Sequence, residues 1–284
     1  MIALGANALF LVVELAGGFA FGSLALLADA THMVSDVAAL AMAYAALVLA
    51  QRPPTTRHTY GLARTEVLVA QANGVLLIAG AVAVVIESVR RLGSPHHVDA
   101  AGVLVVGVLG LGVNLGSALI LRPHAHDSMG VRGALWHLAA DALGSIAVII
   151  SAIGVVLWGA DRLDPIASLF IAALVLFGAF QLLRDATRVL LEAVPAGLDA
   201  DAVRDALCAE PGVEAVHHLH LWTIGSAHAA LSAHVVLGGE LSLHDAQERG
   251  GELKELLSQR FGIEHATLEV ECHACVDEEH IHHA

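Results

Sequence analysis

The chain has 284 residues, of which 57% are hydrophobic and only 15% are charged, and its mean hydropathy is +0.71. Soluble domains carry roughly 25% charged residues, so this composition excludes an ordinary soluble protein and indicates a membrane protein. The formal net charge of −14 is concentrated near the C-terminus: residues 196–284 hold 16 acidic and 4 basic side chains, against 12 and 10 in residues 1–195. This acidic part argues against nucleic-acid binding and is compatible with attracting divalent cations.

Six apolar segments are readable in the first two thirds of the chain, and each is near or above the ~20 residues that a membrane helix needs. Their approximate ranges are 2–20, 24–50, 65–89, 98–121, 131–159 and 166–192. The first segment begins at the start of the chain and the second follows at once, so we interpret it as a membrane span rather than a cleaved signal. The sequence predicts six transmembrane helices within residues 1–195.

Arginine placement predicts the orientation of these helices. Seven arginines lie in or beside the gaps after the second, fourth and sixth segments, and three lie on the opposite side. Because positive residues are enriched on the cytoplasmic side, both chain ends are expected in the cytoplasm.

The sequence predicts that residues 196–284 form a small α+β domain. The pattern favours a helix at about 199–209, strands at 217–224 and 230–237, a helix at 243–261 and a third strand at 265–272. A domain this short buries a modest core, which makes an oligomer plausible.

Two matching motifs lie inside the second and fifth apolar segments, His32-Met-Val-Ser-Asp36 and His137-Leu-Ala-Ala-Asp141. A spacing of four places the imidazole and the carboxylate on one helix face. Ionisable groups are costly in hydrocarbon and typically mark an ion or proton pathway. Two such pairs supply four N/O ligands, the number that tetrahedral Zn²⁺ takes. The alternative is that they are buried hydrogen-bonding groups between helices, which leaves the duplication unexplained.

Asp29, three residues before His32, shares a neighbouring part of the same helix face. We expect it to orient the ligands rather than bind the metal.

The segment Ser-Leu-Ala-Leu-Leu-Ala-Asp29-Ala-Thr-His32-Met-Val-Ser-Asp36 closely resembles the second membrane helix of the cation diffusion facilitators, and Trp136-His137-Leu-Ala-Ala-Asp141 resembles their fifth. Further family-like stretches, in the family's order and spacing, are His58-Thr-Tyr60-Gly61, Arg64-Thr-Glu66, Glu87-Ser-Val-Arg90-Arg91-Leu and His220-Leu-Trp222. The resemblance covers nearly the whole chain.

This resemblance implies a homodimeric exporter with six membrane helices per protomer and a cytoplasmic ferredoxin-like domain, which exchanges a divalent cation for protons. The implied transport site consists of His32, Asp36, His137 and Asp141, a combination similar to that of the zinc-preferring and bacterial zinc, cobalt and cadmium branches. Cd²⁺ and Co²⁺ accept similar ligands, so the sequence leaves the choice among these cations open.

The resemblance to vesicular zinc transporters also implies cytoplasmic zinc sites. His217, His234 and Glu271 are expected to form one site, and Cys272 and Cys275 a second, with further ligands from elsewhere. Some family members have another site in the loop after the second helix. Here His58 is retained, but Thr55 and Leu62 stand where its other ligands are expected, so this loop is not expected to form a full site.

We therefore expect a Zn²⁺/H⁺ antiporter of a bacterial inner membrane that removes zinc from the cytoplasm, and not an enzyme. One alternative is a membrane-anchored zinc sensor or storage protein without transport, which leaves the membrane motifs without a role. A hydrolytic metalloenzyme is the other, but the sequence has no H-E-x-x-H motif and four ligands leave no vacant position for water.

Overall fold

The computed structural model describes residues 2–50, 55–94, 96–121, 129–225 and 228–273, and within them leaves out the side chains of 2–7, 35–36, 39–40, 42–44, 46–50, 120–121 and 129–137. The chain divides into two compact units. The first comprises Met1–Leu47 and Val69–Arg184, and the second comprises Val48–Leu68 and Asp185–Ala284.

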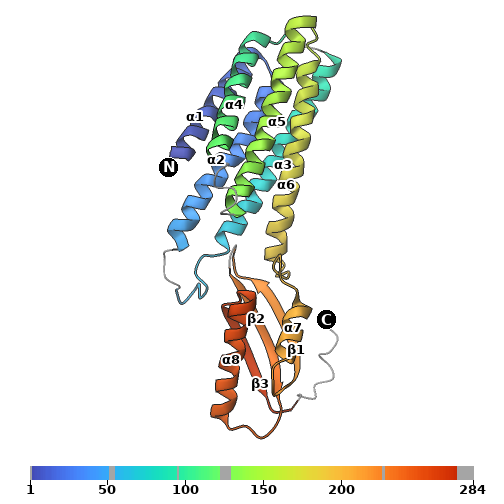
Figure 1. Ribbon diagram of the computed structural model, residues 1–284. Helices are drawn as coiled ribbons and strands as arrows, with labels where there is room; N and C mark the ends of the chain where they lie inside the picture. The colour runs from blue at the N-terminus through green and yellow to red at the C-terminus, as the bar shows by residue number, and fades with distance from the viewer. Residues whose placement is uncertain (1, 51–54, 95, 122–128, 226–227, 274–284) are drawn as a thin grey trace. The chain divides into compact units, whose positions relative to one another are not determined.

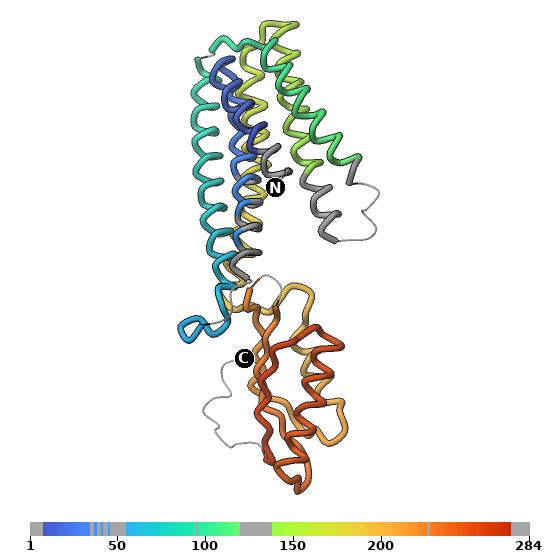
Figure 2. The backbone as a smooth tube through the Cα atoms, turned by 90° about the vertical axis from the view of Figure 1, so that its left-hand side faces the viewer, coloured from blue at the N-terminus to red at the C-terminus, as the bar shows by residue number. Residues whose placement is uncertain are grey.

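The first unit is a bundle of six helices (Figure 1). They are α1 (Ile2–Phe21), α2 (Leu24–Ala50), α3 (Thr65–Gly93), α4 (Ala100–Leu121), α5 (Met129–Trp158) and α6 (Leu163–Leu190). Among the described residues, α3 to α6 contain stretches long and apolar enough to cross a membrane, and α1 and α2 contribute shorter apolar stretches. The predicted six-helix membrane fold is confirmed. α4 and α5 run side by side along one side of the bundle (Figure 2).

The bundle buries small side chains and exposes large ones. Its core is rich in alanine, including Ala25, Ala28 and Ala152, whereas Phe177 and Phe180 of α6 are exposed. Helices in lipid gain nothing by hiding large apolar groups from one another, and small residues allow their backbones to approach closely. At Gly80 of α3, a Cβ atom would lie 2.6 Å from Thr31 Cγ2 of α2, so this crossing requires glycine. The distribution is that of helices surrounded by lipid.

The start of α2 is held by Asp164, the second residue of α6. Ser23 Oγ donates a hydrogen bond to Asp164 Oδ1 at 2.5 Å, and the backbone N–H groups of Leu24 and Ala25 donate to its two oxygens at 2.7 and 3.3 Å. The carboxyl group therefore satisfies backbone donors that the first helical turn leaves without partners. Arg91 of α3 adds a bond from Nη1 to the Gly22 carbonyl at 2.6 Å. The turn between α1 and α2 is thus fixed by two other helices.

The second unit contains an α+β domain of five elements: α7 (Ala200–Cys208), β1 (Val213–Thr223), β2 (Ala229–Leu237), α8 (Leu243–Phe261) and β3 (His265–Glu271) (Figure 1). The sheet order is β1-β2-β3, with β1 antiparallel and β3 parallel to β2. Ser242 caps α8 by accepting a hydrogen bond from the Asp245 N–H, and Gly262 ends the helix with a φ of 67°. The predicted ferredoxin-like α+β domain is confirmed.

The two faces of this sheet have different characters. α7 and α8 pack on one face over a core that includes Leu207, Leu231 and Leu257. The alternate residues of β2 and β3, including His234 and Glu271, point to the opposite face, which we call the open face. Side chains capable of binding metal therefore lie on the side of the sheet that no helix of the domain covers.

A β-bulge in β1 changes which residues face the core. His217 pairs with His234 and His220 with Ser232, so three steps along β1 match two along β2. The extra residue is His218, whose φ of 49° is left-handed. After the bulge, Leu219 and Leu221 face the core, although regular alternation from His217 would put them on the open face. The strand begins at Val213, four residues before the predicted start, because a second register shift, between Val213 and Ala215, interrupts the alternation on which that prediction depended.

Substitution of Leu257 tests the packing of the core of this domain, because the Leu257 side chain is 0% exposed between α8 and the sheet. We expect Leu257→Ala to destabilise the domain by about 2–5 kcal/mol, since the shortened side chain leaves a cavity. Leu243, on the same helix, is 86% exposed, so Leu243→Ala is the matched control and is expected to change stability by less than about 0.5 kcal/mol. Urea unfolding followed by the fluorescence of Trp222 measures both; equal effects would contradict the described core.

Candidate metal sites

The two membrane motifs meet between α2 and α5. His32 Nε2 of α2 lies 3.0 Å from Asp141 Oδ1 of α5, and both side chains are partly buried. The contact joins the histidine of one motif to the aspartate of the other. Asp36 and His137 lie on the same two helices, but their side chains are outside the described ones. Of the four predicted transport ligands, the structure thus brings His32 and Asp141 together.

Asp29 lies one turn from this contact, on the same side of α2. It is buried, and a Cβ atom at Gly144 of α5 would come within 2.9 Å of its Oδ1. His32 contacts Asp141, and Asp29, three residues earlier on α2, lies beside Gly144, three residues later on α5. The two helices therefore run antiparallel through both contacts. The structure places Asp29 beside the pair, and its role in orienting the ligands stays a prediction.

A second group of ligands lies on the open face of the sheet. The ligand atoms of His217, His234 and Glu271 all lie within 4.8 Å of one another. His217 Nε2 is 3.0 Å from Glu271 Oε2, and His234 Nδ1 is 2.7 Å from Glu271 Oε1. Each of the three strands supplies one residue, and His217 and His234 are direct partners in the register. This is the only group of three or more such ligands among the described residues.

Electrostatics keep Glu271 ready to bind a cation. Burial alone would raise its pKa, but the hydrogen bonds from His234 and His217, together with their charge, outweigh burial and lower the pKa below its usual value. Its side chain is therefore an anion at neutral pH. His234 also has its Nε2 3.5 Å from Glu269 Oε2, an arrangement that favours Nδ1 as the ligand atom. Two imidazoles and one carboxylate are a donor set that suits Zn²⁺.

His218 adjoins this group, although the sequence analysis did not single it out. The ring centres of His217, His218 and His234 are each 5.1 Å from the other two. The sequence Val216-His217-His218-Leu219 contains an indication of the bulge, because two consecutive polar residues between apolar ones break a strict alternation.

The predicted cysteine site is described only in part. Cys272 follows β3 and is exposed, and its Sγ lies 3.2 Å from His273 Nδ1. Cys275 lies outside the described residues. The structure thus places one of the two thiols beside a histidine and immediately after Glu271.

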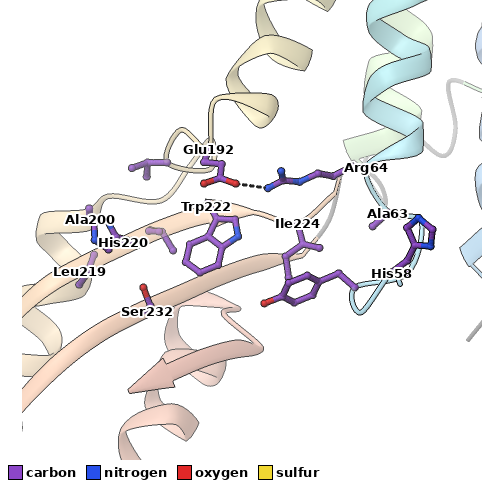
Figure 3. A pocket seen from close by; sticks show the side chains of 14 residues that line it. His58, Ala63, Arg64, Glu192, Ala200, Leu219, His220, Trp222, Ile224 and Ser232 are labelled. Atoms are coloured by element: carbon purple, nitrogen blue, oxygen red, sulfur yellow. Dashed lines mark hydrogen bonds and ion pairs between the residues drawn. The ribbon is translucent and has the colours of Figure 1, made fainter. Parts of the chain in front are cut away.

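The loop before α3 and the open face of the sheet, both in the second unit, line a cavity of about 910 Å³. Figure 3 shows His58 coming from the loop, and His220 and Trp222 from β1. An ion pair of 2.8 Å joins Arg64 to Glu192. Both side chains are largely exposed, so the pair contributes at most about 1 kcal/mol. No group of three ligands forms around His58 in the described part of the chain.

Comparison with known families agrees with both units. The cation efflux transmembrane domain matches residues 1–191, and the cytoplasmic domain of cation efflux proteins matches residues 195–273. A solved structure, the metal-bound C-terminal domain of the CzcD transporter from Cupriavidus metallidurans, is 34% identical. The match covers 26% of this chain and 99% of the CzcD domain, with a TM-score of 0.23.

Characterised relatives match along nearly the whole chain. The zinc transporter ZitB of Escherichia coli is 36% identical over 277 residues, which are 97% of this chain and 87% of ZitB. The metal cation efflux system protein CzcD of Cupriavidus metallidurans is 38% identical over 274 residues, 96% of this chain and 86% of CzcD. The cadmium, cobalt and zinc/H⁺-K⁺ antiporter of Bacillus subtilis is 33% identical over 267 residues, 93% and 86% of the two chains. These relatives are metal ion transporters and not enzymes, so the resemblance expected from the motifs is confirmed: the chain belongs to the cation efflux family of membrane proteins.

Proposed function

We propose that this protein exports Zn²⁺ from the cytoplasm and takes up protons in exchange. The observation that carries the proposal is the 3.0 Å contact between His32 Nε2 and Asp141 Oδ1, which joins two membrane helices through two metal-binding side chains. Imidazole together with carboxylate favours Zn²⁺ over harder cations such as Mg²⁺. Asp36 and His137 would complete a four-ligand site. ZitB and CzcD, whose names refer to zinc transport and metal cation efflux, support the cation class.

The same contact supports proton coupling. An imidazole and a carboxylate in contact can together take up one additional proton, which makes the pair either imidazolium and carboxylate or imidazole and carboxylic acid. Zn²⁺ binds neutral imidazole nitrogen and ionised carboxylate, so this additional proton must leave before both groups bind the metal. Metal and proton therefore exclude each other at His32 and Asp141. A site that holds one or the other and opens alternately to each side of the membrane is an antiporter.

The proposed transport cycle also requires a defined orientation of the chain in the membrane and separate roles for its two parts. We propose that both chain ends are cytoplasmic in a bacterial inner membrane, as the arginine distribution favours. Residues 1–195 would carry the cation, and residues 196–284 would bind regulatory Zn²⁺ at His217, His234 and Glu271 and at the cysteine site. A homodimer is supported by the match to the cytoplasmic domain of cation efflux proteins.

Zinc uptake into proteoliposomes with an imposed pH gradient tests the transport proposal. With inverted protein and an acidic interior, Zn²⁺ is expected to accumulate inside while the interior pH rises, and a protonophore, which dissipates the pH gradient, is expected to abolish the zinc accumulation. Accumulation that ignores the pH gradient would refute proton coupling. Zinc binding without any flux in the wild-type protein would favour the membrane-anchored sensor or storage protein instead. Repeating the assay with Cd²⁺ and Co²⁺ ranks the substrates.

Glu271→Gln tests the cytoplasmic zinc site. The substitution keeps the size of the side chain but removes the only negative charge among the three ligands, so we expect zinc affinity at this site to fall by about tenfold or more. Isothermal titration of the full-length protein, with the membrane site silenced by Asp36→Ala and Asp141→Ala, measures the change. Glu264→Gln, at an exposed glutamate of the same domain, is the control. Equal affinities would remove Glu271 from the site.

The cysteine site is tested by transport at low zinc concentration. If it biases the dimer toward a transport-competent state, Cys272→Ser combined with Cys275→Ser will slow uptake at low Zn²⁺ and leave the maximal rate unchanged. Uptake that matches wild type at every concentration would exclude this regulatory role.

A further inference from the structure

We propose that His218 is the fourth ligand of the cytoplasmic zinc site. This inference deepens the proposed function, because it rests on His217, His234 and Glu271 binding Zn²⁺. Those three residues each offer one ligand atom, whereas structural Zn²⁺ sites are almost always four-coordinate and tetrahedral. One position therefore remains for a further side chain or for water.

The backbone places His218 where such a ligand is needed. In a regular strand, the residue after His217 would point to the core, among the leucines under α7 and α8. The bulge makes His218 the extra residue instead, and its side chain is exposed next to His217 and His234. A left-handed φ costs a residue with a Cβ atom on the order of 1–2 kcal/mol. Bulges recur next to functional sites, where they redirect a side chain.

The spacing of the three rings agrees with tetrahedral coordination. With a Zn–N distance of about 2.05 Å, the centre of a bound imidazole lies about 3.2 Å from the metal, and two imidazoles at the tetrahedral angle have their centres about 5.2 Å apart. The three observed separations, His217–His218, His217–His234 and His218–His234, are each 5.1 Å. Three rings at equal distances of this size can surround one zinc ion.

The remaining step is a side-chain rotation. The ring nitrogens of His218 are not yet part of the group whose ligand atoms lie within 4.8 Å of one another. Rotation about its side-chain bonds turns one nitrogen toward the metal, and its exposure leaves room for this movement. Glu269 Oε2 lies 3.5 Å from His234 Nε2, an ion-pair distance at which the carboxylate favours this orientation of the ring. The complete site would then contain three imidazoles and one carboxylate.

Zinc titration of the full-length protein with His218→Gly tests the proposal. Glycine removes the imidazole but accepts a left-handed φ, so the bulge is retained and the metal-free domain is expected to melt at or above the wild-type temperature. The parent protein carries Asp36→Ala, Asp141→Ala, Cys272→Ser and Cys275→Ser, which silence the other proposed sites. Competition with a chromophoric chelator gives the dissociation constant for Zn²⁺. We expect it to rise by about tenfold to hundredfold.

Two further variants make the result decisive. His228→Ala removes another exposed histidine of the domain and is expected to leave the dissociation constant within twofold of the parent. Glu271→Gln reports on the site itself. If Glu271→Gln weakens binding but His218→Gly does not, water occupies the fourth position and the proposal is wrong, although the site stands. If the parent protein binds no zinc here, the cytoplasmic part of the proposed function fails as well. Should His218→Gly lower the metal-free melting temperature, His218→Asn, which also tolerates this φ, replaces it in the same comparison.

Discussion

Asp141→Ala is expected to abolish zinc transport, lowering the initial rate of pH-driven uptake into proteoliposomes by about a hundredfold or more. The substitution removes a ligand and leaves His32 facing a cavity instead of a carboxylate. Because the same pair is proposed to hold the exchanged proton, zinc-driven proton movement should disappear together with zinc uptake.

Two comparisons separate this effect from misfolding. Asp141→Asn retains a hydrogen-bond acceptor for His32 but not the negative charge, so we expect it to keep the melting temperature while transport is lost. Asp185→Asn removes a charge at an exposed position of α6 and should transport normally. Full activity of Asp141→Ala would show that the cation follows another path through the bundle.

Asp164→Ala is expected to produce the largest loss of stability in the membrane bundle. The carboxyl group, 1% exposed, accepts hydrogen bonds from Ser23 Oγ and from the backbone N–H groups of Leu24 and Ala25. A buried donor left without a partner costs about 1–3 kcal/mol, and the burial of Ser23, Leu24 and Ala25 keeps water from replacing the lost acceptor. A loss of about 3 kcal/mol corresponds to a decrease in melting temperature of about 6–12 °C for a unit of this size.

Thermal unfolding in detergent measures this decrease. Asp164→Asn retains one acceptor oxygen and should fall between wild type and alanine. Asp161→Ala, in the turn just before α6 and only half-buried, is the control and should melt as wild type does. Since α2 also carries His32 and Asp36, the alanine variant should transport slowly even at temperatures where it is folded. A melting temperature unchanged by Asp164→Ala would show that the start of α2 is held by other contacts.

The helices were predictable from sequence because burial in lipid imposes a simple rule. An apolar run of sufficient length must form its backbone hydrogen bonds internally, so the six runs became α1 to α6 with bounds within a few residues of those predicted. The meeting of α2 and α5 could also be anticipated, since two costly ionisable pairs stabilise each other only if they face one another.

Contacts between distant residues were harder to predict. Asp164 was not singled out, because a single acid beside Pro165 is an ordinary start to a helix and its partners lie about 140 residues earlier in the chain. The bulge at His218 was missed because strand assignment assumes a period of two, and one extra residue defeats that assumption locally. The register that joins His217, His234 and Glu271 came from family resemblance, since pairing between strands is set by packing that one sequence does not display.

The bulge also bears on how this domain can change by insertion and deletion. His217 and Leu219 are two positions apart, which in a regular strand would place both on one face, yet His217 faces the ligands and Leu219 the core because the bulge lies between them. Deleting His218 would remove the extra residue: Leu219 would follow His217 directly and still face the core, and the pairs His217–His234 and His220–Ser232 would join in one continuous register. A single-codon deletion here should therefore preserve the sheet and the ligands His217, His234 and Glu271, and remove only the proposed fourth ligand.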